Sequence, residues 1–190
     1  MKFWDWIAQE THLLSYPETP HGPIGLIYPN IYPVGMASLG YQQIYRLFKE
    51  SGFSIERVFF DKKGRETRSV ENKTPLFRFP LLAATYTYEL HIITLLQLLL
   101  RGRVEPPSQL RGEGSPLFLV GGQAATANPR LLQRFADMVY LGEAEEMLPL
   151  IGKVLTHLKN QSRRQILEAL AEIPHVYVPQ VHGEFDRIRF

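Results

Sequence analysis

Short apolar runs alternate along the chain with longer segments in which apolar residues recur every three or four positions. The short runs predict β-strands at residues 25–28, 55–60, 81–86, 117–120 and 138–141. The longer segments predict helices at residues 39–50, 88–101, 129–135, 143–158 and 162–171. Strands that alternate with helices are typical of an α/β fold, so we expect a mostly parallel open sheet of about five strands with helices on both faces.

Local signals mark the ends of several predicted elements. Gly52 follows the helix at 39–50, as expected at a helix C-terminus, and Asn128 precedes Pro129 as an N-cap. Residues 61–73 are polar and charged and predict an exposed excursion, whereas residues 175–181 predict an extended tail. Residues 2–15 have the pattern of a short amphipathic helix.

These elements divide the chain into three parts. Residues 1–20 are expected to form an N-terminal helical arm, residues 21–180 a single α/β domain, and residues 181–190 the start of a linker. An apolar surface near Trp4, Trp6 and the tail is expected to allow self-association of the chain as a fragment.

The loops that follow the predicted strands are the expected place for ligands. In an open parallel sheet, ligands bind outside the carboxyl ends of the strands, where the strand order reverses. The candidate binding residues in these loops are Tyr28, Asn30, Thr85, Thr87, Gly121, Gly122, Gln123 and Glu143. We predict no catalytic residue and no metal ligand in this chain.

Several candidates also have a purely structural interpretation. Gly121 and Gly122 allow close approach of a flat ligand, but they suit a tight turn equally well, and they lack the G-x-G-x-x-G order of a dinucleotide site. Thr87 is either a ligand contact or the cap of the following helix. Tyr86 and Tyr88 either stack on a ligand or pack at the edge of the sheet.

Composition excludes several classes of function. The 190 residues carry 21 basic and 19 acidic side chains, a formal charge of +2, so there is no direct sign of nucleic-acid binding. With no cysteine, the chain cannot hold a disulfide, a thiolate zinc site or a cysteine-bound iron–sulfur cluster. The six histidines are scattered without metal-ligand spacing. No secretory signal is visible and the most apolar run, near 92–100, is too short for a membrane span, which predicts a cytoplasmic protein.

Six segments, in one order, resemble a known family. Residues 26–40 (LIYPNIYPVGMASLG) are similar to the opening of a group of radical S-adenosylmethionine (SAM) proteins with an N-terminal cobalamin-binding-like domain. Further similar segments, in the family's order, are ERVF at 56–59, TYTYEL at 85–90, VGGQAATANP at 120–129, LGEAEE at 141–146 and IPHVYVP at 173–179.

The resemblance implies a Rossmann-like, cobalamin-binding-like domain followed by a catalytic barrel that carries SAM and a 4Fe-4S cluster. Two departures limit it. The cobalamin-ligating D-x-H-x-x-G motif is missing after the first strand, so any bound cobalamin would have no protein histidine ligand. The cysteines of the cluster are also missing, so SAM and the cluster are expected only in a barrel that begins after about residue 190.

Three functions remain open at this point. The first is an accessory domain of a radical SAM enzyme that covers the barrel and holds a corrinoid or part of the substrate. The second is a freestanding module that binds a nucleotide or corrinoid. The third is a structural cap without a ligand, whose crevice is blocked by side chains such as Tyr28, Tyr86 and Tyr88.

Overall fold

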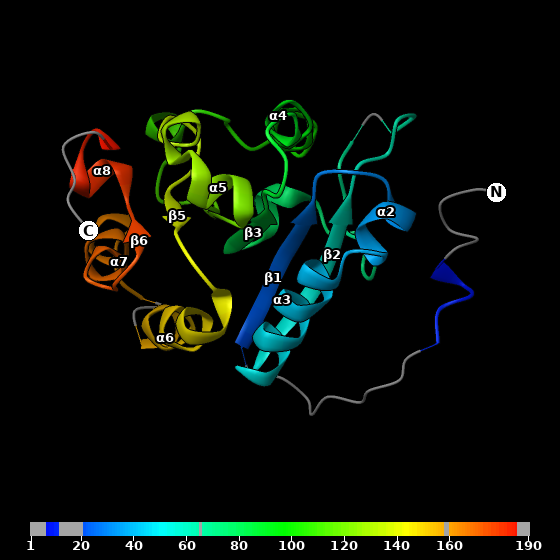
Figure 1. The fold of residues 1–190 in the computed structure, drawn as a ribbon, viewed down its shortest axis with the longest axis horizontal. Coiled ribbons are helices and arrows are strands. Elements are labelled where there is room, and N and C mark those ends of the chain that lie inside the picture. Colours follow the sequence, from blue (N-terminus) through cyan, green and yellow to red (C-terminus); the bar gives the residue numbers. More distant parts are fainter. Residues whose placement is uncertain (1–6, 12–20, 65, 158–159, 186–190) are drawn as a thin grey trace.

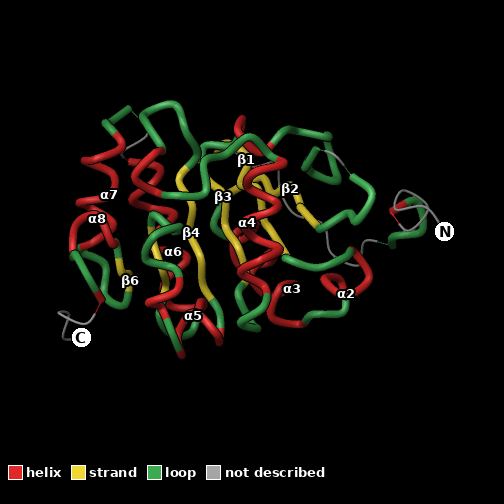
Figure 2. The backbone as a smooth tube through the Cα atoms, turned by 90° about the horizontal axis from the view of Figure 1, so that it is seen from above, coloured by secondary structure: helices red, strands yellow, loops and turns green. Residues whose placement is uncertain are grey.

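One six-stranded sheet organises the fold. The computed structural model describes residues 7–11, 21–64, 66–157 and 160–185. The strands lie in the order β2-β1-β3-β4-β5-β6, and Figure 2 labels all of them except β5. Only the β5–β6 pair is antiparallel. Their bounds are β1 (His21–Tyr28), β2 (Phe53–Phe59), β3 (Leu81–Thr85), β4 (Leu117–Gly121), β5 (Met138–Tyr140) and β6 (Val176–Tyr177).

Helices connect the parallel strands and follow the last of them. They are α2 (Tyr32–Met36), α3 (Leu39–Glu50), α4 (His91–Arg101), α5 (Gln123–Ala127), α6 (Ala144–His157), α7 (Arg163–Ala171) and α8 (Pro179–His182). Short 3₁₀ turns lie at η1 (Leu76–Arg78), η2 (Ser108–Leu110) and η3 (Pro129–Leu131). Figure 1 shows α7, α8 and β6 at the end of the molecule opposite β2.

The two faces of the sheet form two separate apolar cores, because successive strand residues point to opposite faces. Leu26 and Leu119 pack on one face with buried residues of α3, α6 and α7. Ile27 and Val120 pack on the other face with buried residues of α4 and α5. The predicted α/β fold with helices on both faces is confirmed.

The strand order reverses between β1 and β3. From β1 the chain crosses to β2 at one edge and then returns to β3 on the other side of β1. The carboxyl ends of β1 and β3 therefore lie side by side while their connections leave in opposite directions, which is the arrangement that opens a crevice in such sheets.

Four local predictions differ from the structure. Residues 123–127 form α5, which no apolar periodicity announces, and the helix predicted at 129–135 is only the turn η3, without a side-chain cap from Asn128. The predicted extended tail at 175–181 is extended only at β6 and Val178, because α8 begins at Pro179. The helix α4 begins at His91, three residues after the predicted start.

The predicted exposed excursion at 61–73 is also partly wrong. Thr67, Ser69 and Val70 are buried, because the excursion folds back along the outer side of β2. The N–H of Val70 donates to the carbonyl of Arg57 at 2.8 Å. Of the predicted helix at 2–15, only residues 7–11 fall within the described residues.

Candidate functional site

A cavity of about 550 Å³ lies on the α3–α6 side of the sheet, toward the carboxyl ends of the parallel strands. This volume lies within the range of sites for small organic ligands. Strand residues line its floor, α3 and α6 form walls, and the loops after β3, β4 and β5 supply the remainder. The described lining residues are Leu26, Gly40, Tyr41, Gln43, Ile44, Phe48, Ala83, Ala84, Thr85, Thr87, Leu119, Gly121, Gly122, Gln123, Thr126, Ala127, Tyr140, Gly142, Glu143, Ala144, Glu145 and Leu148.

The cavity brings together most of the candidate residues from the sequence. Six of the eight line it, namely Thr85, Thr87, Gly121, Gly122, Gln123 and Glu143. Tyr28 and Asn30 do not line it. The side chain of Tyr28 is buried against Tyr41, with ring centroids 5.4 Å apart, and the side-chain oxygen of Asn30 accepts from the N–H of Ile31. Their role in binding stays a prediction.

Gly122 is required by the backbone of the fold. Its φ of +116° lies in a region that favours glycine, and an added Cβ would come within 2.8 Å of the carbonyl oxygen of Tyr86. The same carbonyl accepts from the N–H of Ala124 at 3.1 Å, and the N–H of Tyr86 donates to Gly121 at 2.7 Å. The space beside the two glycines is therefore occupied by the backbone of the chain's own loop at Tyr86.

Thr85 and Thr87 differ in their surroundings. Thr85 ends β3, is only 7% exposed, and its buried hydroxyl has no hydrogen-bond partner among the described residues. Thr87 is exposed and does not cap α4, whose N-cap position is Leu90 without a side-chain hydrogen bond. Of the pair, Thr85 is the one with unused hydrogen-bonding capacity inside the protein.

The rim of the cavity at the start of α6 is acidic. Glu143 and Glu145 are both exposed and line the cavity. The loop that carries Glu143 is held by the Tyr140 hydroxyl, which donates to its carbonyl at 2.5 Å, and by the N–H of Gly142, which donates to the Thr126 hydroxyl at 3.2 Å. These contacts position the carboxylates where α6 begins.

Sequence reasoning missed the helical walls. Tyr41, Ile44 and Phe48 of α3 line the cavity, whereas the sequence pattern at residues 39–50 predicted only a helix. The buried hydroxyl of Tyr41 donates to the carbonyl of Leu26 at 3.0 Å, and burial raises the pKa of Tyr41 well above its ordinary value. The periodicity of α3 identified this face but not the space in front of it.

The sequence analysis also did not identify His91, which lies near the place where the strand order reverses between β1 and β3. It is 9% exposed, its ring stands edge-on to Tyr28 and Tyr88 with centroids 5.8 Å away in both cases, and its Nδ1 is buried without a partner among the described residues. Burial lowers the pKa of His91 below its ordinary value, which favours the neutral imidazole. It does not line the cavity.

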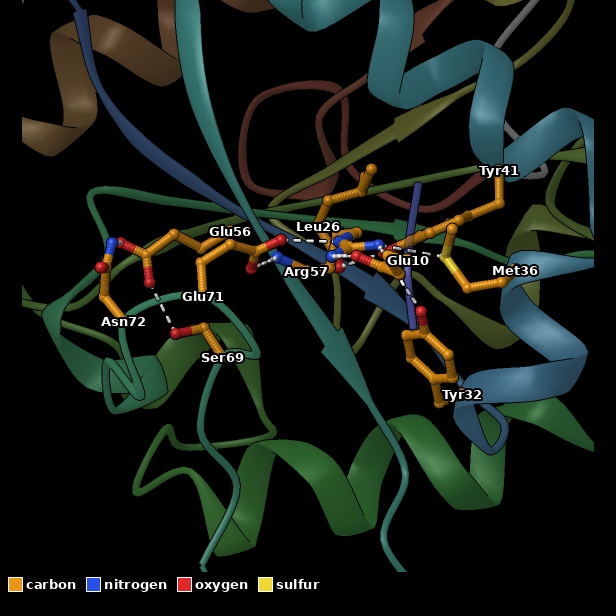
Figure 3. A network of polar contacts seen from close by, with 10 residues as sticks. All are labelled: Glu10, Leu26, Tyr32, Met36, Tyr41, Glu56, Arg57, Ser69, Glu71 and Asn72. Atoms are coloured by element: carbon orange, nitrogen blue, oxygen red, sulfur yellow. Dashed lines mark hydrogen bonds and ion pairs between the residues drawn. The ribbon is translucent and has the colours of Figure 1, made fainter. Parts of the chain in front are cut away.

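A buried ion cluster holds the N-terminal segment and the excursion against β2 (Figure 3). Arg57 donates from Nη1 and Nη2 to Glu10 at 2.5 and 2.8 Å, and from Nε to Glu71 at 2.6 Å. The Tyr32 hydroxyl also donates to Glu10. We call Arg57, Glu10, Glu71 and Tyr32 the Arg57 cluster.

Burial and charge shift the pKa values in the Arg57 cluster. Burial alone would lower the pKa of Arg57, but Glu10 and Glu71 outweigh it and hold the pKa above its ordinary value. Burial raises the pKa of Glu71, against the influence of Arg57. Burial, together with the hydrogen bond to Glu10, raises the pKa of Tyr32 to about 12.

A second ion cluster lies at the amino ends of β4 and β5. One oxygen of Asp137 accepts from Arg163 at 2.6 Å, from Arg111 at 3.1 Å and from the N–H of Phe118 at 2.8 Å. Burial, opposed by Asp137, lowers the pKa of Arg111. We call Asp137, Arg111 and Arg163 the Asp137 cluster. It lies at the opposite ends of the strands from the loops of the cavity and fastens α7 to the sheet.

Within the described part of the chain, no group of three or more acidic, histidine or cysteine side chains is placed to hold a metal ion. Among the helices that the structure describes, none has the length and apolar character of a membrane span.

The family model for radical SAM proteins, N-terminal, matches residues 40–179, about three quarters of the chain. The match runs from the start of α3 to the start of α8 and includes the walls and loops of the cavity. No curated protein and no solved structure matches the chain. The chain belongs to the family of N-terminal regions of radical SAM proteins.

Proposed function

We propose that this chain acts as an accessory domain of a radical SAM protein and holds a small ligand, either a corrinoid or part of the substrate, in the cavity. The observation that carries the proposal is the cavity itself, about 550 Å³ in volume at the carboxyl ends of the parallel strands. Open parallel sheets bind their ligands at this edge. The ligand would there be presented to the catalytic barrel of the same protein.

The position of exposed apolar side chains supports a partner at this edge. Ile31 and Val34 lie on or next to α2, after β1, whereas Tyr88, Leu90 and Ile93 lie around the start of α4, after β3. All five are at least 36% exposed. Because β1 and β3 are neighbours, the two groups rise from the same stretch of the edge. A barrel that docks on the carboxyl ends of these two neighbouring strands would cover both groups.

The structural cap without a ligand has less support. That alternative expects Tyr28, Tyr86 and Tyr88 to block the crevice. None of the three is among the described residues that line the cavity, and the Tyr86 hydroxyl donates to the carbonyl of Glu89. The freestanding module has no specific observation in its favour.

The described lining residues place limits on a corrinoid. They include no histidine, so a corrinoid in this cavity would receive no imidazole ligand from its walls. Because the chain has no cysteine, the iron–sulfur cluster would be bound by the barrel.

Two titrations test the proposal. The first adds hydroxocobalamin to the purified chain and follows its visible spectrum. The second records backbone amide NMR shifts while a library of small organic compounds is added. We expect at least one ligand to shift the amides of the cavity, and a spectral change if that ligand is the corrinoid.

A blocking variant makes the result specific to the cavity. Ala127→Trp places a large ring at an exposed lining position and should abolish the binding. Gln97→Trp adds the same ring at an exposed position of α4, which covers the other face, and should leave binding unchanged. If neither titration perturbs the cavity, or if both variants bind as the parent does, the proposal is wrong.

A further inference from the structure

The cavity has an unusual charge composition for a site next to a glycine-containing loop and two helix N-termini. Its described lining residues include no lysine, arginine or histidine. The only charged ones are Glu143 and Glu145. A ligand that enters therefore meets two negative charges at the rim and no positive side chain to neutralise an anion.

Negatively polarised or charged oxygen atoms also lie at both places where the backbone would ordinarily attract an anion. Phosphate sites in such folds use glycine loops and free N–H groups at a helix N-terminus. Here the carbonyl of Tyr86 fills the space beside Gly122 and accepts from the N–H of Ala124. At the start of α6 the two carboxylates offset the positive end of the helix dipole. A phosphate at either place would therefore lie close to negatively polarised or charged oxygen atoms.

Thr85 independently indicates that a ligand belongs in the cavity. Its side chain points to the same face as Leu81 and Ala83, two residues apart along β3, and that face carries α3 and α6. The hydroxyl is buried, and none of the described residues accepts from it or donates to it. A buried polar group without a partner is unfavourable, so a bound group that bonds to it would be stabilised.

The shape of the walls limits the body of the ligand. Ala83 and Gly121 add little bulk to the floor, and Tyr41 and Tyr140 line the cavity together with aliphatic residues. A flat apolar group fits between such surfaces, whereas a branched polar group would lose its water without compensation.

We propose that the cavity selects a phosphate-free ligand: a neutral or cationic molecule of about nucleoside size, with a flat apolar body and hydroxyl or amino groups. Those groups bond to the Thr85 hydroxyl inside and to Glu143 and Glu145 at the rim. This inference rests on the proposed function, because it assumes that the cavity binds a ligand, and it adds the chemical class of that ligand.

Adenosine and adenosine monophosphate are the test pair, because they differ only in the phosphate. Calorimetric titration at low salt should show that adenosine binds at least about tenfold more tightly, since charges of like sign a few ångströms apart repel strongly. The preference should shrink as salt is added. Equal or tighter binding of the monophosphate, or no binding of adenosine, overturns the inference.

Variants assign the effect to the named residues. The double variant Glu143→Gln, Glu145→Gln should reduce the difference in affinity between adenosine and adenosine monophosphate. The matched double variant Glu105→Gln, Glu172→Gln neutralises two exposed carboxylates outside the cavity. It should leave the difference in affinity between the two compounds unchanged. Thr85→Val should weaken adenosine binding several-fold without lowering the melting temperature of the free chain, which a purely structural role would not produce.

The outcomes separate this inference from the proposed function. If the chain does not bind adenosine more tightly than adenosine monophosphate, but other compounds still shift the cavity amides, the chemical class is wrong and the proposed function stands. If adenosine binds selectively and hydroxocobalamin does not bind, the class is right and the corrinoid is excluded. If no compound perturbs the cavity, both proposals fail.

Discussion

The Arg57 cluster and the Asp137 cluster are built with opposite charge balance. In the first, one arginine lies between two carboxylates, and the side chains of Glu10 and Glu71 remain 15% and 28% exposed. In the second, one carboxylate lies between two arginines, and the side chains of Arg111 and Asp137 are fully buried while that of Arg163 is 8% exposed. Both join segments that are distant in sequence.

The difference shows two ways to tolerate an unbalanced charge. The extra negative charge of the Arg57 cluster has access to water and can be removed by a proton. Arginine does not give up its proton, so the extra positive charge of the Asp137 cluster must be stabilised by other means. Backbone carbonyls supply this: Arg111 donates to Glu105, Pro106 and Phe135, and Arg163 donates to Ser115.

The largest effect is expected from Asp137→Asn, which leaves two buried arginines without their counter-ion. We expect the free energy of unfolding to fall by about 3–5 kcal/mol, the usual loss when one partner of a buried pair is removed. Urea denaturation followed by far-UV circular dichroism measures it. Glu105→Gln, at an exposed position, should change stability by no more than about 0.5 kcal/mol.

Arg163→Met sharpens this prediction, because it leaves the neutral Arg111–Asp137 pair. It should therefore lower the free energy of unfolding clearly less than Asp137→Asn does in the same denaturation experiment. If the two variants lose equal stability, the charge balance of the Asp137 cluster is unimportant and only its hydrogen bonds matter.

Arg57→Met is expected to have an intermediate effect. The two carboxylates that lose their partner reach water, so the loss should be about 2 kcal/mol, between the values for buried and exposed pairs. Hydrogen exchange should also increase at residues 7–11 and 69–72, which the cluster holds against β2. A loss as large as that of Asp137→Asn would contradict the distinction between the clusters.

The smallest effect is expected from Tyr32→Phe, which removes one hydrogen bond to Glu10 and about 1 kcal/mol at neutral pH. The difference in stability between the parent and the variant depends on pH. The folded pKa of Tyr32 is about 12 and the ordinary value is 10.0, so the unfolded chain loses this proton first as pH rises. As the pH rises from the ordinary to the folded pKa, the parent should lose stability, and Tyr32→Phe should lose less. Denaturation midpoints across this pH range test the expectation, and parallel curves for the two proteins would refute it.

Local signals predicted the regular parts of the fold. The helix α3 has the predicted bounds, because the Ser38 hydroxyl caps its start and Gly52, at φ +85°, follows its end. Five parallel strands were predicted from buried apolar runs. The strand β6 was not, since Val176 and Tyr177 become a strand only by pairing with β5, and α5 was not, since its alanines carry no periodicity.

The candidate site was predictable only at its loops. Strand ends identify Thr85, Gly121 and Glu143, because the edge of a parallel sheet follows from the order of elements. The space between α3 and α6 depends on how the two helices pack, and no sequence pattern gives that spacing. The Asp137 cluster is similar, because Arg111 and Arg163 meet one carboxylate through loops whose path is set by the whole fold.

The folded-back excursion also bears on how the protein avoids aggregation. The strand β2 lies at an edge of the sheet and would offer its outer backbone groups to a strand of another molecule. At Arg57 both are already used: the N–H donates to the carboxylate of Glu71 and the carbonyl accepts from Val70. At the other edge, β6 is only two residues long. Edge-to-edge polymerisation through β2 would first require residues 69–72 to move away from this strand.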